Sequence, residues 1–287
     1  AAVGPAVWAP AAGRQAPGGR PAGSLRAIIA PHIDLRLGGA CTALAYRLLE
    51  EAPAVDTVIV LGTSHACPSP DWIVLDKPFE TPLGPVPVNS KLAAQLAEAS
   101  QAPPESVHYH RREHSVEFQA LFLAALRATG RDLRMVPVLC GSLRKILVDS
   151  DGNQFEDQSG PPSPEETPFL ATLSRVLEEL GDRALVVAGA DLAHVGPRFG
   201  DPEPLNERHL ELLETRDRAT LSLAAGGDAM GFYAHVVDQG DPRRICGLSP
   251  VYGLLATMRR ARGKVLRYEQ ATDPSGTVSY ATLGFWG

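Results

Sequence analysis

Histidines follow apolar, β-branched runs at three places in the chain. These places are 25–32, 57–65 and 184–194, which end at His32, His65 and His194. The loops at the carboxyl ends of parallel strands converge on one edge of a sheet, so we expect the three imidazoles to lie close together. Two neutral imidazoles and one further ligand can bind a divalent metal ion and leave a coordination position open, which is typical of a catalytic site.

The third ligand must come from elsewhere in the chain, and the candidates are Asp191, Glu113, His114 and Cys246. Cys246 lies in RRICGLSP, where Arg243 and Arg244 are expected to favour the thiolate that binds metals. Glu113 and His114 stand before a helix expected to begin at Ser115, so they are also candidates for orienting the ligands without binding the metal.

The remaining histidines and cysteines are expected to have structural roles. Cys41, Cys67 and Cys140 form no CxxC pair and are expected to be small buried hydrophobic residues. We expect His108 and His110 in a loop, and His209 and His235 on the surfaces of amphipathic helices. The sequence contains no GxSxG motif, Walker loop or dinucleotide fingerprint.

Strand-like and helix-like segments alternate along most of the chain. The expected strands are 25–30, 57–62, 72–75, 134–139 and 184–189. The expected helices are 39–51, 90–100, 114–128, 165–180, 206–226, 227–240 and one that starts after GLSP. This order predicts an α/β fold with a mainly parallel central sheet flanked by helices on both faces. The runs at 264–273 and 277–286, joined by Pro-Ser-Gly, predict a C-terminal antiparallel hairpin.

Composition defines the domain limits and narrows the class of partner. Residues 1–24 are rich in Ala, Gly and Pro and are expected to form a flexible arm, while 25–287 are expected to form one domain. The polar segment 149–168 is expected to be a mobile loop insertion. A formal net charge of −6 disfavours nucleic acid and favours small-molecule or protein partners.

Neither a membrane-spanning segment nor a signal peptide is expected. The sequence holds no apolar stretch near the roughly 20 residues that a spanning helix needs, and no basic segment followed by an apolar one. These observations predict a cytoplasmic protein without a membrane partner.

Seven motifs occur in the order found in one known family. They are APHIDLRLGG, VIVLGTSH, FETPLG, EHSVEFQALFL, MVPVLCG, AGADLAHVGPRFGD and ICGLSPVYGLL. In this order they resemble the Memo family, the AmmeMemoRadiSam system protein B proteins. The match runs from about residue 27 to the C-terminal strands. The chain departs from the family pattern after His32, where polar residues replace an aromatic, and at Val195.

The resemblance implies a fold similar to that of the class III extradiol ring-cleaving dioxygenases. It also implies that His32, His65 and Cys246 bind a mononuclear metal ion, with Asp191 and His194 beside it. His194 would then take the place of the acid/base histidine of a dioxygenase. A thiolate ligand favours softer or redox-active metals, so iron or copper is expected and zinc is compatible.

Three functions are compatible with such a cleft. The first is a metal-dependent redox enzyme, similar to a dioxygenase, with an unknown small-molecule substrate. The second is a binding scaffold in which Arg36, Arg198 and Arg243 recognise an anionic group of a peptide or partner. The third is a metal-dependent hydrolase. The family's gene-cluster name also suggests a radical SAM protein as a companion.

Overall fold

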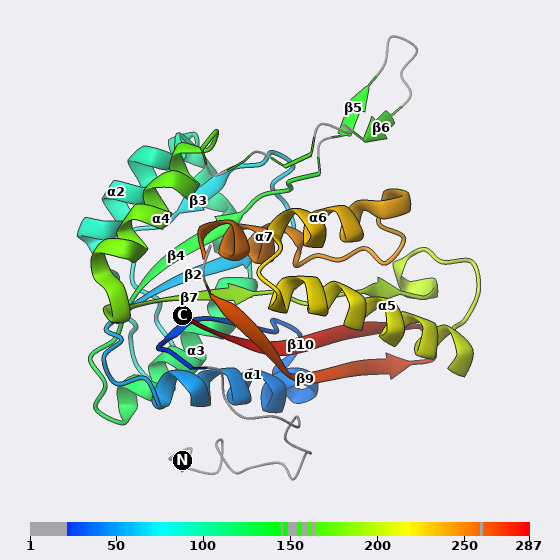
Figure 1. Ribbon diagram of the computed structural model, residues 1–287, viewed down its shortest axis with the longest axis horizontal. Coiled ribbons are helices and arrows are strands. Elements are labelled where there is room, and N and C mark those ends of the chain that lie inside the picture. Colours follow the sequence, from blue (N-terminus) through cyan, green and yellow to red (C-terminus); the bar gives the residue numbers. More distant parts are fainter. Residues whose placement is uncertain are drawn as a thin grey trace.

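The computed structural model describes residues 22–144, 146–148, 154–156, 160, 161, 163, 165–258 and 261–287. Most of the expected arm at 1–24 and half of the expected loop at 149–168 lie outside the described residues, so their mobility stays a prediction. The strand β5 (Ile146–Val148), just before the second segment, pairs with β6 (Gln154–Glu156), within it, as an antiparallel ribbon that leaves the body of the fold (Figure 1).

An eight-stranded sheet forms the centre of the fold. Its order is β3-β4-β2-β7-β1-β10-β8, and β9 pairs with β10 outside this path. The strands are β1 (Leu25–Ala30), β2 (Thr57–Thr63), β3 (Trp72–Val74), β4 (Arg134–Cys140), β7 (Ala184–Gly189), β8 (His194–Val195), β9 (Arg262–Asp273) and β10 (Gly276–Trp286). The four strands β4, β2, β7 and β1 run parallel, whereas β3, β8, β9 and β10 pair antiparallel. The expected mainly parallel centre is therefore confirmed.

Helices cover both faces of the sheet, as expected (Figure 1). Their bounds are α1 (Leu35–Glu50), α2 (Ser90–Ser100), α3 (Ser115–Ala128), α4 (Pro168–Leu180), α5 (Glu207–Ala225), α6 (Ala229–Val237) and α7 (Leu248–Thr257). The helices α1 and α3 contact one another and one face, while α4, α6 and α7 pack together on the other. Two helix starts follow from capping: the side chains of Asp34 and Asn206 accept backbone N–H groups in the first turns of α1 and α5.

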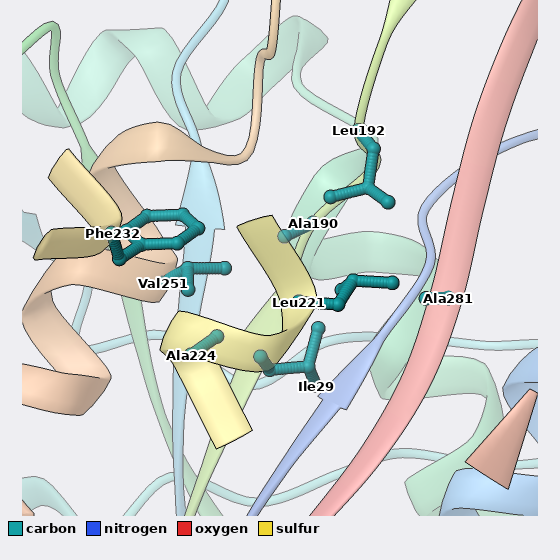
Figure 2. Close-up of a pocket in the computed structure, with 8 residues that line it drawn as sticks. All are labelled: Ile29, Ala190, Leu192, Leu221, Ala224, Phe232, Val251 and Ala281. Atoms are coloured by element: carbon teal, nitrogen blue, oxygen red, sulfur yellow. The ribbon is translucent and has the colours of Figure 1, made fainter. Parts of the chain in front are cut away.

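The buried strands follow directly from their apolar sequences. All residues of β2 and β7 are buried, because these central parallel strands have helices on both faces. On one face, α5, α6 and α7 meet β1 and β10 around an apolar void of about 10 Å³. Figure 2 shows Leu221, Phe232 and Val251 with their side chains gathered there. The void has room for one water molecule at most, so it is a packing gap and not a ligand pocket.

Three local expectations need correction. The first helix begins at Leu35 and not at residue 39, because Asp34 caps it. The last helix begins at Leu248, so the Ser-Pro pair lies inside its first turn, where proline's missing N–H leaves no broken bond. The segment 104–112, expected as a loop with His108 and His110, is a 3₁₀ helix (Pro104–Arg112).

The C-terminal hairpin is confirmed, with a two-residue turn at Pro274 and Ser275. Asp273 faces Gly276 in the register, and its side chain accepts the Ser275 N–H at 2.7 Å. Such a side-chain bond stabilises a tight turn between antiparallel strands. Among the described helices, none is both long and apolar enough to cross a membrane.

Candidate metal centre

The expected site residues meet at one edge of the sheet. His32, His65 and Asp191 follow the carboxyl ends of β1, β2 and β7, and His194 begins the short strand β8. Cys246 lies two residues before the helix α7, and α7 packs on β2 and β7. The convergence of parallel strands therefore places these residues together, as the positions of the histidines predicted.

The side chains of His32, His65 and Cys246 each offer one ligand atom, and these atoms lie within 4.8 Å of one another. The Cys246 Sγ atom is 3.3 Å from His32 Nε2, and the two imidazole rings meet edge to face at a centroid distance of 5.2 Å. Two nitrogens and one sulfur at this spacing are a donor set that fits a single metal ion.

The backbone fixes the orientation of His32. Its Nδ1 lies 2.9 Å from the Gly189 carbonyl oxygen, which can only accept, so Nδ1 is the protonated nitrogen. Burial lowers the pKa of His32 to about 4 and keeps the ring neutral. The Nε2 lone pair therefore faces the Cys246 sulfur, which is the state that a metal ligand requires.

A buried carboxylate orients His65 in the same way. Glu113, 8% exposed, accepts the His65 backbone N–H at 2.9 Å and stands 3.0 Å from its Nδ1. Burial alone would raise the pKa of Glu113, but the hydrogen bonds from His65 outweigh it and lower the pKa to about 2. The same hydrogen bond raises the pKa of His65. The carboxylate thus holds the Nδ1 proton and leaves Nε2 for a metal.

Asp191 supports the loop that carries His32. Its Oδ1 accepts the backbone N–H groups of His32 and Ile33 at 3.0 and 3.2 Å, and its Oδ2 is 3.7 Å from His32 Nε2. Burial raises the pKa of Asp191 to about 6. The carboxylate therefore stands beside the ligand set and shapes the backbone around it.

The expectation that arginines activate Cys246 as a thiolate is wrong. Burial raises the pKa of the Cys246 thiol well above its ordinary value. The two neighbouring guanidinium groups point elsewhere, because Arg243 pairs with Asp217 at 2.8 Å and Arg244 with Asp201 at 2.5 Å. A metal ion would have to displace the thiol proton, as metal binding to cysteine generally does.

His114 lies closer to the site than a role in orientation alone requires. Its half-exposed ring stacks on His65 at 5.2 Å and meets His32 edge to face at 5.4 Å. With His65 and Glu113 it forms a second set of potential ligand atoms within 4.8 Å. Glu113 also accepts the backbone N–H groups of His114 and Ser115, which suits an orienting carboxylate better than a ligand.

His194 lines the edge of the centre. Its Nδ1 lies 3.1 Å from the Leu192 carbonyl oxygen, so this nitrogen is the donor and Nε2 is left unprotonated in the neutral ring. Burial lowers the pKa of His194, and the Asp191 charge opposes this shift. Phe199 packs edge to face against the ring at 5.2 Å. The catalytic role expected for His194 and Asp191 stays a prediction.

The three arginines expected to recognise an anion occupy different environments. Arg243 is 5% exposed and its charge is already paired with Asp217, so it is not available to a partner. Arg36 and Arg198 are exposed and pair with Asp34 and Asp273, respectively.

His235 was expected on the surface, but it is half-buried and contacts the Thr220 hydroxyl at 2.9 Å.

Asp217 was not among the residues expected to have a role, although its position in the sequence carried a signal. In α5 the buried positions are Leu213, Asp217, Thr220, Leu221 and Ala224, which recur at helical spacing. An acidic residue on such an apolar stripe indicates a buried carboxylate with a specific partner.

A surface hollow of about 670 Å³, larger than the apolar void between the helices and the sheet, is lined by Arg26 at the start of β1 and lies away from the histidines.

Comparison with known proteins gives a consistent result. A family profile described as "Memo-like protein" matches residues 12–157 and 163–284. A MEMO1 family protein of Methanopyrus kandleri is 25% identical over 271 residues, which cover 91% of this chain and 83% of the relative. One from Aquifex aeolicus is 26% identical over 269 residues, covering 91% of this chain and 64% of the relative.

A MEMO1 family protein of Thermus thermophilus is 28% identical over 252 residues, which cover 85% of this chain and 66% of the relative. The chain thus spans slightly less than two thirds of the Aquifex and Thermus proteins. Among solved structures, the uncharacterized protein JW3007 of Escherichia coli K12 matches 91% of this chain and 99% of its own, with 12% identity and a TM-score of 0.44. The family profile spans most of the sequence, and the chain belongs to the Memo-like protein family.

Proposed function

We propose that this chain is a mononuclear metal protein with redox activity toward a small molecule. His32, His65 and Cys246 would bind the ion, with iron or copper favoured by the sulfur ligand and zinc also compatible. One observation carries the proposal: two imidazoles, each bound at Nδ1 by an acceptor, and one sulfur offer three ligand atoms within 4.8 Å of one another, and the Nε2 of His32 lies 3.3 Å from that sulfur. A fold similar to the class III extradiol dioxygenases, a radical SAM companion and a cytoplasmic location stay predictions.

When bound, iron or copper would supply electron transfer and an open coordination position. The chain's own residues have distinct tasks around it. Gly189 and Glu113 hold the ligand imidazoles in one orientation, and Asp191 fixes the His32 backbone. The role proposed for His194, whose Nε2 is unprotonated in the neutral ring, is to accept a proton from the substrate. Burial of His32 and Asp191 limits the access of water to the inner side of the centre.

Metal content tests this proposal first. Protein purified without oxygen and without a His tag is expected to hold about one iron or copper per chain, measured by elemental analysis. X-ray absorption at the metal edge should then show two nitrogen ligands and one sulfur ligand from the protein. Oxygen uptake with candidate aromatic substrates would support the redox function. Bound zinc without oxygen uptake would favour a hydrolase. Folded protein that binds none of the metal ions added to it would favour a binding scaffold.

A second expectation concerns the carboxylate behind His65. Glu113→Gln keeps the shape of the side chain but replaces one carboxylate oxygen by an amide N–H. This N–H faces groups that donate to Glu113 in the wild type, namely His65 Nδ1 and the His114 backbone N–H, so the His65 ring loses its fixed orientation. We expect metal affinity to fall about 10- to 100-fold, measured by competition with a chelator. Glu179→Gln is the control, because Glu179 is exposed and pairs with Arg175 on its own helix. Equal affinities for the two variants would contradict the orienting role.

A further inference from the structure

A buried polar cluster lies behind the candidate centre, where α5 contacts the β9–β10 hairpin (Figure 1). Its middle is Asp217, whose 0% exposed carboxylate accepts three side-chain hydrogen bonds. Arg243 donates at 2.8 Å, Tyr268 at 3.0 Å and Ser279 at 2.5 Å. The carboxylate therefore has a counter-charge and two further donors, and a hydrogen-bonded network of this kind makes the chain around it more rigid.

One of these bonds fixes the loop that carries Cys246. Arg243 is anchored to α5 through Asp217 and through the Thr220 hydroxyl at 2.9 Å. Its own carbonyl oxygen accepts the His194 N–H at 2.7 Å. Cys246 follows three residues later. The loop is therefore fastened to α5 by a side chain and to β8 by its backbone.

A second bond fixes the segment that carries Asp191 and His194. The Ser279 hydroxyl donates to Asp217 and accepts the Ala193 N–H at 3.0 Å. The Ser279 backbone pairs with the same segment, accepting from Leu192 at 2.8 Å and donating to Ala193 at 3.0 Å. The hydroxyl thus stands between the buried carboxylate and the residues beside the candidate ligands.

The two fastened segments also touch each other. The Gly247 N–H donates to the Asp191 carbonyl oxygen at 3.1 Å, and a Cβ at Gly247 would lie 2.4 Å from that oxygen. The close approach leaves little room for one segment to slide past the other. A small displacement of either segment would therefore move Cys246 relative to His32.

We propose that Asp217 is a positioning residue of the metal centre, acting through Arg243 and Ser279 to hold Cys246 against the histidine ligands. This inference rests on the proposed metal binding. The third donor to Asp217 is Tyr268 of β9, whose hydroxyl also contacts Gln270 and Ser279; among the described residues it forms no hydrogen bond with either of the two segments. Residues that orient metal ligands from behind commonly change metal affinity 10- to 100-fold when replaced.

Three variants test the proposal, with Co²⁺ as the probe. Asp217→Asn and Ser279→Ala are expected to weaken Co²⁺ binding about 10-fold or more, measured by chelator competition, and to shift the sulfur-to-cobalt absorption band. Tyr268→Phe removes one hydrogen bond from the same carboxylate and is expected to change affinity by less than about 2-fold. Folded Ser279→Ala with wild-type affinity and spectrum, or Tyr268→Phe with the same loss, would overturn the proposal. If Asp217→Asn does not fold, the other two variants still decide.

A metal-free readout separates this proposal from the proposed function. Wild-type protein that binds no Co²⁺ would refute the metal function alone. Hydrogen exchange of the amides of Ala193, His194 and Gly247 would then still report on the positioning. Faster exchange in Ser279→Ala and not in Tyr268→Phe is the expected result. Identical exchange in the two variants would rule out the role of Asp217 at these segments.

Discussion

Cys246→Ser is expected to weaken metal binding by about 100-fold or more while the protein stays folded. Metal sites with cysteine and histidine ligands bind with a free energy on the order of 10 kcal/mol, so one of three ligands contributes about 3 kcal/mol, or about 100-fold. Serine keeps the shape, but its hydroxyl hardly ionises and is a poor ligand for iron or copper. Chelator competition measures the affinity, and loss of the sulfur-to-metal absorption band identifies the ligand.

Cys41→Ser is the matched control for this experiment. Cys41 is fully buried in α1, and its sulfur lies 3.2 Å from the Thr282 hydroxyl, which can also bond a serine. The control should keep wild-type metal content, and both variants should unfold within about 1 kcal/mol of wild type. Full metal occupancy of Cys246→Ser would remove Cys246 from the ligand set. It would then favour a centre built on the set of His65, Glu113 and His114.

Arg243→Met is expected to lower the free energy of unfolding by about 3–5 kcal/mol. The substitution leaves the Asp217 carboxylate buried without its counter-charge, and breaking a buried pair from one side typically costs this much. Methionine fills a comparable volume, so the loss would report the charge rather than a cavity. Urea unfolding of metal-free protein measures the effect without any contribution from metal binding.

Arg198→Met provides the comparison on the surface. Arg198 pairs with Asp273 at 3.2 Å, but the two side chains are 46% and 49% exposed. Water screens such a pair, so its loss should cost no more than about 1 kcal/mol. Similar losses for Arg243→Met and Arg198→Met would mean that the Asp217 pair is hydrated in solution and does not anchor the loop.

Local sequence signals determined the framework of this protein. The continuous apolar, β-branched run from Thr57 to Leu61 is typical of a strand that is buried on both faces, so it predicted a central parallel strand. His32 and His65 come directly after such strands, and parallel strands end at one edge of a sheet. Their meeting could therefore be inferred without coordinates. The hairpin at Pro274 and Ser275 could also be predicted, because its turn and its two strands are contiguous in the chain.

The tertiary structure decided the chemistry of individual groups. Cys246 and His32 are 214 residues apart, and no local pattern states that their side chains stand 3.3 Å from each other. The neighbouring sequence even gave a false signal, since Arg243 lies in the same loop as Cys246 but pairs its charge with Asp217. Protonation and ion pairing depend on burial and on long-range partners, whereas strand formation depends on neighbours in sequence. The meeting of His32 and His65 could thus be predicted from the sequence pattern, whereas the choice of Cys246 came from the family resemblance, and the charges and supporting contacts were decided by packing.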